Sequence, residues 1–134
     1  MHNKLGMPLF IDKECKYLIY SIGGLYYDLK KSINDFLPNI EARNRIIYGD
    51  NHTPKKISWG YNNRTVAINI KTLKNKYIIE HRVPSNNCNI FQITKIIINS
   101  IASGIKNKIN PPQPIYGNAF DEQYKLENII KPLL

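Results

Sequence analysis

The sequence has few cysteines and lacks any long apolar run. Only Cys15 and Cys88 are present, too few for a zinc ribbon or a disulfide framework, so both are interpreted as small buried or half-buried thiols. No stretch of about eighteen apolar residues occurs, and residues 1–10 contain no apolar core of about seven residues. The sequence gives no support to secretion or membrane insertion, and we expect a cytoplasmic protein.

Acidic residues are also scarce, with 10 Asp and Glu against 19 Lys and Arg, so the formal net charge is +9. Such a charge would permit binding to the phosphate backbone of nucleic acid. The lysines are scattered, however, without an aromatic-interleaved RNA-binding pattern, a Cys/His finger or a long basic arm. The 23 Ile and 17 Asn indicate a compositional drift of the whole chain, so nucleic acid is not an expected partner.

Apolar periodicity predicts two long helices within a single domain of 134 residues. The first covers residues 16–36 and ends before Pro38. Its interior Gly23 and Gly24 indicate either local softness or close packing against another element, and we favour packing. The second helix covers residues 89–107 and carries a broad isoleucine stripe that should be buried.

Alternating apolar residues predict strands between the helices. We expect a β-hairpin over residues 55–70, with its turn at residues 61–63, and a further strand over residues 76–83 with Glu80 and Arg82 on one face. Residues 110–114 should form a stiff extended connector, and residues 121–134 a short helix broken at Pro132. The predicted fold class is α+β, an antiparallel sheet packed with two long helices on one side.

Three ordered blocks carry a family resemblance: residues 57–65 (ISWGYNNRT), 79–84 (IEHRVP) and 111–120 (PPQPIYGNAF). Together they resemble the C-terminal part of a glutamine synthetase catalytic domain, from about residue 17 onward. The Pro-Pro-Gln-Pro run is more similar to the branch that joins glutamate to polyamines, the γ-glutamylpolyamine synthetases. We therefore expect residues 1–134 to be a partial domain, without the family's N-terminal β-grasp domain and most of its metal-binding glutamates.

The resemblance implies ATP-dependent ligation of ammonia or an amine to the γ-carboxylate of glutamate, with Mg²⁺ or Mn²⁺ as cofactor. It implies that Arg64 stabilises the phosphoryl group, Glu80 ligates the divalent cation and Arg82 binds the substrate carboxylate. A guanidinium suits such tasks because its planar fork grips oxyanions bidentately. Arginine is also rare here, with 4 residues against 15 lysines. Without the motifs, each arginine would be interpreted as a surface or ion-paired residue.

Further roles implied by the resemblance fall on less complete matches. Arg45 would be a second substrate-carboxylate contact, Asp50 the nearest acid to the family's flap residue, and His2 a remnant metal ligand. The loop before Lys55 contains one more titratable group, His52, which either accepts a proton or is merely solvated.

Departures from the family pattern bear on activity. Asn69 and Ile78 stand where the family has arginines that contact ATP phosphates, and Phe120 replaces a tyrosine that some bacterial members adenylylate. We expect the isolated chain to be inactive. The alternatives are a non-catalytic subunit that docks on a complementary N-terminal chain, a full-length homologue or its own copies, and a split-gene remnant without function.

Overall fold

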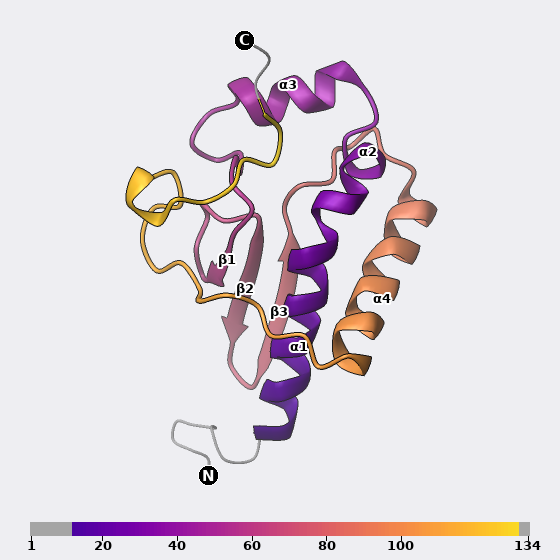
Figure 1. Cartoon of the computed structure of the whole chain (residues 1–134), viewed down its shortest axis with the longest axis vertical. Coiled ribbons are helices and arrows are strands. Elements are labelled where there is room, and N and C mark those ends of the chain that lie inside the picture. The colour runs from indigo at the N-terminus through magenta and orange to yellow at the C-terminus, as the bar shows by residue number, and fades with distance from the viewer. Residues whose placement is uncertain (1–11, 132–134) are drawn as a thin grey trace.

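The structure is a computed structural model that describes residues 12–131, so His2 lies outside the described residues. It is an α+β fold in which helices lie beside a small sheet (Figure 1). In chain order the elements are α1 (Asp12–Asp28), η1 (Lys30–Ser32), α2 (Ile33–Phe36), α3 (Ile40–Tyr48), β1 (Trp59–Tyr61), β2 (Ile68–Leu73), β3 (Lys76–His81), α4 (Ile90–Lys106) and η2 (Glu122–Tyr124).

The three strands form one mixed sheet in the order β1-β2-β3. β2 and β3 are antiparallel and joined by a tight turn in which Asn75 has a φ of 70°, whereas β1 and β2 are parallel. The predicted hairpin over residues 55–70 is therefore wrong. Asn62 does turn the chain, with a φ of 47°, but residues 62–67 form a wide loop that carries the chain back to the start of β2.

Contacts distant in sequence hold that loop open. The Asn63 side chain donates to the carbonyls of Ile115 and Gly117, both at 2.9 Å, and the Asn63 amide N–H donates to Asn69 Oδ1 at 2.9 Å. A pair of asparagines also suits a two-residue turn, so the local sequence does not distinguish the two outcomes.

α1 and α4 pack side by side against one face of the sheet, and the main apolar core lies between these layers (Figure 1). The helices approach closely at two glycines. A Cβ atom on Gly24 would lie 2.0 Å from the Ser100 carbonyl oxygen, and one on Gly104 would lie 2.1 Å from that of Tyr20. A Cβ atom on Gly23 would lie 2.0 Å from the Ile109 carbonyl oxygen, so the packing interpretation of Gly23 and Gly24 is confirmed. The first predicted helix is interrupted after Asp28, where a 3₁₀ turn precedes α2, and it ends before Pro38 as expected.

The second predicted helix is confirmed as α4, whose N-cap Asn89 accepts hydrogen bonds from the backbone N–H groups of Phe91 and Gln92. Burial of its isoleucine stripe is incomplete. Ile93 is buried, but Ile90 and Ile98 are 64% and 60% exposed, and Phe91 beside them is 84% exposed. α4 therefore retains an apolar outer surface.

The C-terminal segment is extended where it was predicted to be helical. After the short η2 turn, Glu127 and Ile129 make backbone hydrogen bonds of 2.8 and 2.9 Å with Ile57 and Lys55. The connector over residues 110–114 has no regular secondary structure, and its Pro112 carbonyl accepts a 2.7 Å hydrogen bond from the Trp59 indole. Across residues 12–131, no helix has the length and apolarity needed to span a bilayer.

Candidate functional site

The sheet face opposite the helices carries a row of polar side chains. Ile68 and Ile70 point into the core, so the alternating Asn69 and Lys71 point to the other face. The β2–β3 register places Glu80 directly across from Asn69, and therefore on the same face. This polar face is where the sequence-predicted residues of β3 lie.

Glu80 has a partner on each carboxylate oxygen. Asn69 donates to Oε1 at 3.2 Å, and Lys71 Nζ lies 3.2 Å from Oε2. The hydrogen bond from Asn69 holds the pKa of Glu80 below its usual value; partial burial opposes this, and the nearby charges of Lys71 and Arg82 reinforce it. The Arg82 Nε atom lies 3.9 Å from Oε1, so the prediction that Glu80 and Arg82 share a face is confirmed.

Arg82 binds three backbone carbonyl groups. Its Nη1 atom donates to the Val66 oxygen at 3.0 Å and also to the Arg64 oxygen, and its Nη2 atom donates to the His52 oxygen at 2.6 Å. The side chain is only 16% exposed. Burial lowers the pKa of Arg82, the charge of Glu80 opposes this, and the charges of Arg64 and Arg45 lower it further. The guanidinium fork thus fastens the loop before β1 and the loop after it to the end of β3.

Arg64 lies in the 62–67 loop and is exposed, and its guanidinium makes no ion pair with another side chain of residues 12–131. It lines a surface cavity of about 330 Å³ whose other walls come from β2 and from Asn62. The lining residues are Asn62, Arg64, Asn69, Lys71, Thr72 and Leu73. Two cationic groups, those of Arg64 and Lys71, therefore face one cavity, which suits an anionic ligand.

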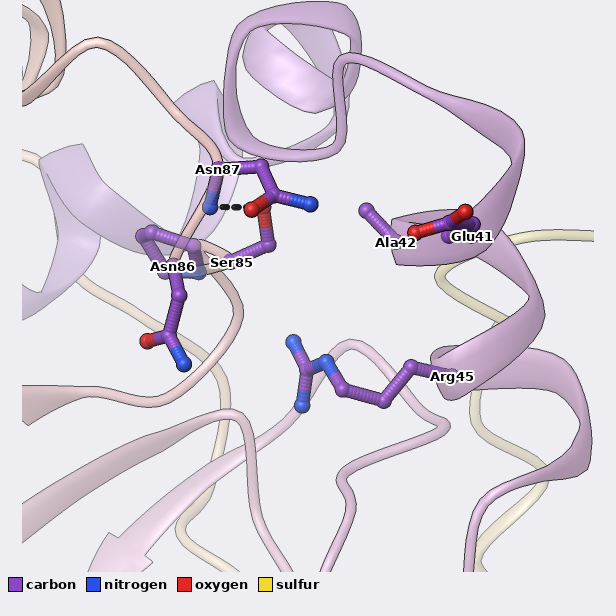
Figure 2. Close-up of a pocket in the computed structure, with 7 residues that line it drawn as sticks. Glu41, Ala42, Arg45, Ser85, Asn86 and Asn87 are labelled. Carbon is purple, nitrogen blue, oxygen red and sulfur yellow. Dashed lines mark hydrogen bonds between the residues drawn. The ribbon is translucent and has the colours of Figure 1, made fainter.

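Arg45 lines a second cavity, of about 290 Å³, between α3 and the loop that follows β3. Figure 2 shows its guanidinium reaching from α3 towards Ser85, Asn86 and Asn87. One nitrogen, Nη2, donates to the Val83 carbonyl at 2.9 Å. Because Val83 directly follows Arg82, the Arg45 guanidinium lies next to the backbone segment that carries Arg82.

The Asp50 loop meets this cluster through its backbone. Asp50 Oδ1 accepts a 2.9 Å hydrogen bond from the His52 N–H, and the His52 carbonyl is the one that Arg82 binds. Both side chains are exposed. The structure therefore gathers Arg45, Arg64, Glu80 and Arg82 near the end of β3, with the loop of Asp50 and His52 beside them.

Lys71 and Asn63 are site residues that the sequence reasoning missed. Asn63 shapes the loop that presents Arg64, and its Oδ1 atom accepts a 2.6 Å hydrogen bond from Thr65. Lys71 stands two positions after Asn69 on β2 and so shares its face, a signal that could have been used once the strand was predicted.

The side chains around Glu80 do not provide the ligands that a divalent cation needs. Mg²⁺ and Mn²⁺ require several oxygen ligands, whereas the Glu80 oxygens already contact an ammonium and an amide. Within the part of the chain that the structure describes, no three His, Cys, Asp or Glu side chains group to hold a metal ion.

Comparison with known proteins agrees with the sequence blocks. The profile of the family described as "Glutamine synthetase, catalytic domain" matches residues 1–133. A glutamine synthetase of Thermotoga maritima is 32% identical over 114 residues, covering 84% of this chain and 25% of that protein. The γ-glutamylputrescine synthetase PuuA of Escherichia coli is 26% identical over 127 residues, covering 92% of this chain and 27% of that protein.

A glutamate–isopropylamine ligase of a Pseudomonas species is 29% identical and covers 86% of this chain. In three dimensions, a solved complex of GmaS with ADP superposes with a TM-score of 0.73 at 20% identity, covering 96% of this chain and 29% of that one. At this identity the likeness concerns the fold. The chain spans about a quarter of the length of the curated relatives it matches.

Proposed function

Because the chain belongs to the glutamine synthetase catalytic-domain family, we propose that it supplies the carboxylate- and phosphoryl-contacting part of an ATP-dependent ligase that joins ammonia or an amine to glutamate. The observation that carries this proposal is the Arg82 network. It connects the segments of Arg45, Arg64 and Glu80 around the end of one strand. Relatives that make amides of putrescine and isopropylamine support an amine as well as ammonia for the acceptor.

In the proposed reaction, a γ-carboxylate oxygen of glutamate attacks the terminal phosphorus of ATP, and ADP leaves. The amine nitrogen then attacks the carbonyl carbon of the γ-glutamyl phosphate, loses a proton and expels phosphate. Arg45 binds a carboxylate in the 290 Å³ cavity, where its guanidinium faces the 85–87 loop. Arg64 offsets the charge of the phosphoryl group in the 330 Å³ cavity, where its own charge is free of an ion pair among the described residues. Arg82 positions both loops through their carbonyls, and the exposed Asp50 is the acid available to attract the amine.

We further propose that residues 1–134 alone do not catalyse this ligation. Asn69 hydrogen-bonds Glu80 and Ile78 is 40% exposed on the same face, so neither offers a positive charge to a polyphosphate. Loss of one such contact to a transferring phosphoryl group costs about a hundred-fold in rate. Assembly with the rest of a ligase site is therefore required for activity.

Isothermal titration of the purified chain with glutamate tests the binding role. We expect saturable binding that Arg45→Gln weakens at least about tenfold, because a charge-assisted bidentate contact is lost. Arg43→Gln is the matched control, since it removes the same charge from α3 while Arg43 itself binds the Leu37 carbonyl outside the cavity. Equal binding by wild type and Arg45→Gln would refute the assignment of this cavity.

A phosphate-release assay with ATP, glutamate, Mg²⁺ and either ammonia or putrescine tests the claim of inactivity. We expect no release above the ATP-only background. Release that depends on both glutamate and the amine would contradict the claim and would show that the 134 residues hold a complete site.

A second candidate function is that of a non-catalytic subunit docked on another glutamine synthetase-like chain. The observation in its favour is the apolar outer surface of α4, formed by Ile90, Phe91 and Ile98, because clustered exposed apolar side chains mark interaction surfaces. Sedimentation of the wild-type chain and of Phe91→Asp distinguishes a chain that docks through α4 from one that does not. A wild-type chain that remains monomeric at about 50 µM, a range in which weak interfaces are populated, would count against docking through α4.

A further inference from the structure

We propose that Lys71 is the resident cation of this site: its ammonium group occupies, beside Glu80, the position that a divalent cation would need. The inference rests on the proposed ligase role, since only that role gives Glu80 a cation to bind. The family resemblance implies that Glu80 ligates a divalent cation. In this inference, the positive charge beside Glu80 is instead a side chain of the same protein, Lys71.

The pairing follows from the register of two strands. Glu80 stands across from Asn69, and Lys71 is one step diagonal to it on the same face, a spacing that long side chains bridge. The result is the 3.2 Å contact between Lys71 Nζ and Glu80 Oε2. Asn69 takes the other oxygen, also at 3.2 Å, so the carboxylate is bound on both sides.

The local charge disfavours any additional cation. Lys71 and Arg82 already place two positive groups within 4 Å of the single Glu80 carboxylate. A divalent ion bound to either oxygen would lie close to both and would be repelled by them. Lys71 would have to leave Glu80 before an ion could bind there.

Lys71 also lines the 330 Å³ cavity together with Arg64. Its charge therefore lies at the wall of the cavity where we place the phosphoryl group. In this chain the positive charge at that wall comes from two side chains, with Glu80 holding one of them in place.

Paramagnetic broadening by Mn²⁺ in amide NMR spectra of the purified chain tests the inference without ATP or glutamate. Traces of Mn²⁺ broaden amides near a bound ion, so selective loss of the signals of residues 69–71 and 80 reports binding at Glu80. We expect little selective broadening in wild type. Lys71→Met should bind Mn²⁺ at Glu80 at least about tenfold more tightly, because the competing ammonium is gone and the carboxylate is released.

Lys74→Met is the matched control, since it removes the same charge from the exposed turn between β2 and β3. It should behave as wild type, and Glu80→Gln added to Lys71→Met should abolish the new broadening. Equal broadening near Glu80 in wild type and Lys71→Met, whether strong or absent, would overturn the inference. The spectra themselves show whether each variant is folded. Failure here would leave the glutamate-binding test of the proposed function unaffected.

Discussion

At the scale of single residues, His81 at the end of β3 has a buried polar atom that is not satisfied. Its ring packs edge-on against Phe36 with centroids 4.8 Å apart, and its Nε2 atom is buried without a hydrogen-bond partner among the described residues. The Val83 N–H points at Nδ1 from 3.5 Å, which leaves the ring proton on Nε2. Burial lowers the pKa of His81 to about 4. The imidazole is therefore neutral in the folded protein at neutral pH.

This depressed pKa makes the free energy of unfolding pH-dependent. The unfolded chain binds a proton at His81 near pH 6.5, whereas the folded chain does not until about pH 4, so stability is full above about pH 7 and falls as pH decreases through that window. Between pH 7.5 and pH 5 we expect a loss of about 2 kcal/mol in urea unfolding. His81→Leu should remove most of this slope, whereas the exposed His52→Gln should retain it. An unchanged slope in His81→Leu would contradict the assignment.

Arg82 is expected to contribute more to stability than the other arginines of the site. Arg82→Gln leaves the carbonyls of His52, Arg64 and Val66 without their donor, and the loss should be about 2–3 kcal/mol in urea unfolding. Arg64→Gln is the control, because replacing the exposed Arg64 side chain should lower the free energy of unfolding by less than about 0.5 kcal/mol. Similar losses for both variants would show that the carbonyl contacts are not what holds the loops.

At the scale of elements, the close contact of α1 and α4 depends on glycines, which have no side chain. Alanine normally stabilises a helix interior by about 1 kcal/mol relative to glycine. At Gly24 the added methyl group would meet the backbone of α4 at 2.0 Å, so Gly24→Ala should instead destabilise the protein by about 2 kcal/mol or more. Thermal unfolding monitored by circular dichroism measures this, with the exposed Asn99→Ala on α4 as a neutral or stabilising control. A stabilised Gly24→Ala would mean that the helices are not in close contact.

Elements whose signal is local were predictable from sequence, and those set by distant contacts were not. α4 was predicted within one residue at each end because its periodicity and its N-cap Asn89 are adjacent in the chain. The direction of β1 relative to β2 depends on Asn63 binding residues 115 and 117, and the extended C-terminal segment depends on pairing with residues 55–57. The motifs identified Glu80 and Arg82, but Lys71 acquires its role only through the β2–β3 register.

At the scale of the whole molecule, one apolar core joins the beginning and the end of the described chain. It extends from Ile22 in α1 to Ile129 in the C-terminal segment and includes Trp59 of β1. Trp59, the single tryptophan, is 3% exposed and donates to the Pro112 carbonyl. Its fluorescence therefore reports on the contact between the sheet and the connector.

We expect this core to unfold in a single step. The urea transition monitored by Trp59 fluorescence should coincide with the transition monitored by far-ultraviolet circular dichroism, which is dominated by the helices. Trp59 fluorescence that changes at a lower urea concentration than the helical signal would show that the connector detaches first and that the core consists of two units.

Among the strands of residues 12–131, the order β1-β2-β3 places β3 at the margin of the sheet, beside β2. In general, a strand at the margin of a sheet is where an extended peptide can add by backbone hydrogen bonding. Strand addition would convert the margin into the middle of a wider sheet, and side chains of the newcomer would then stand directly beside Glu80 and Arg82.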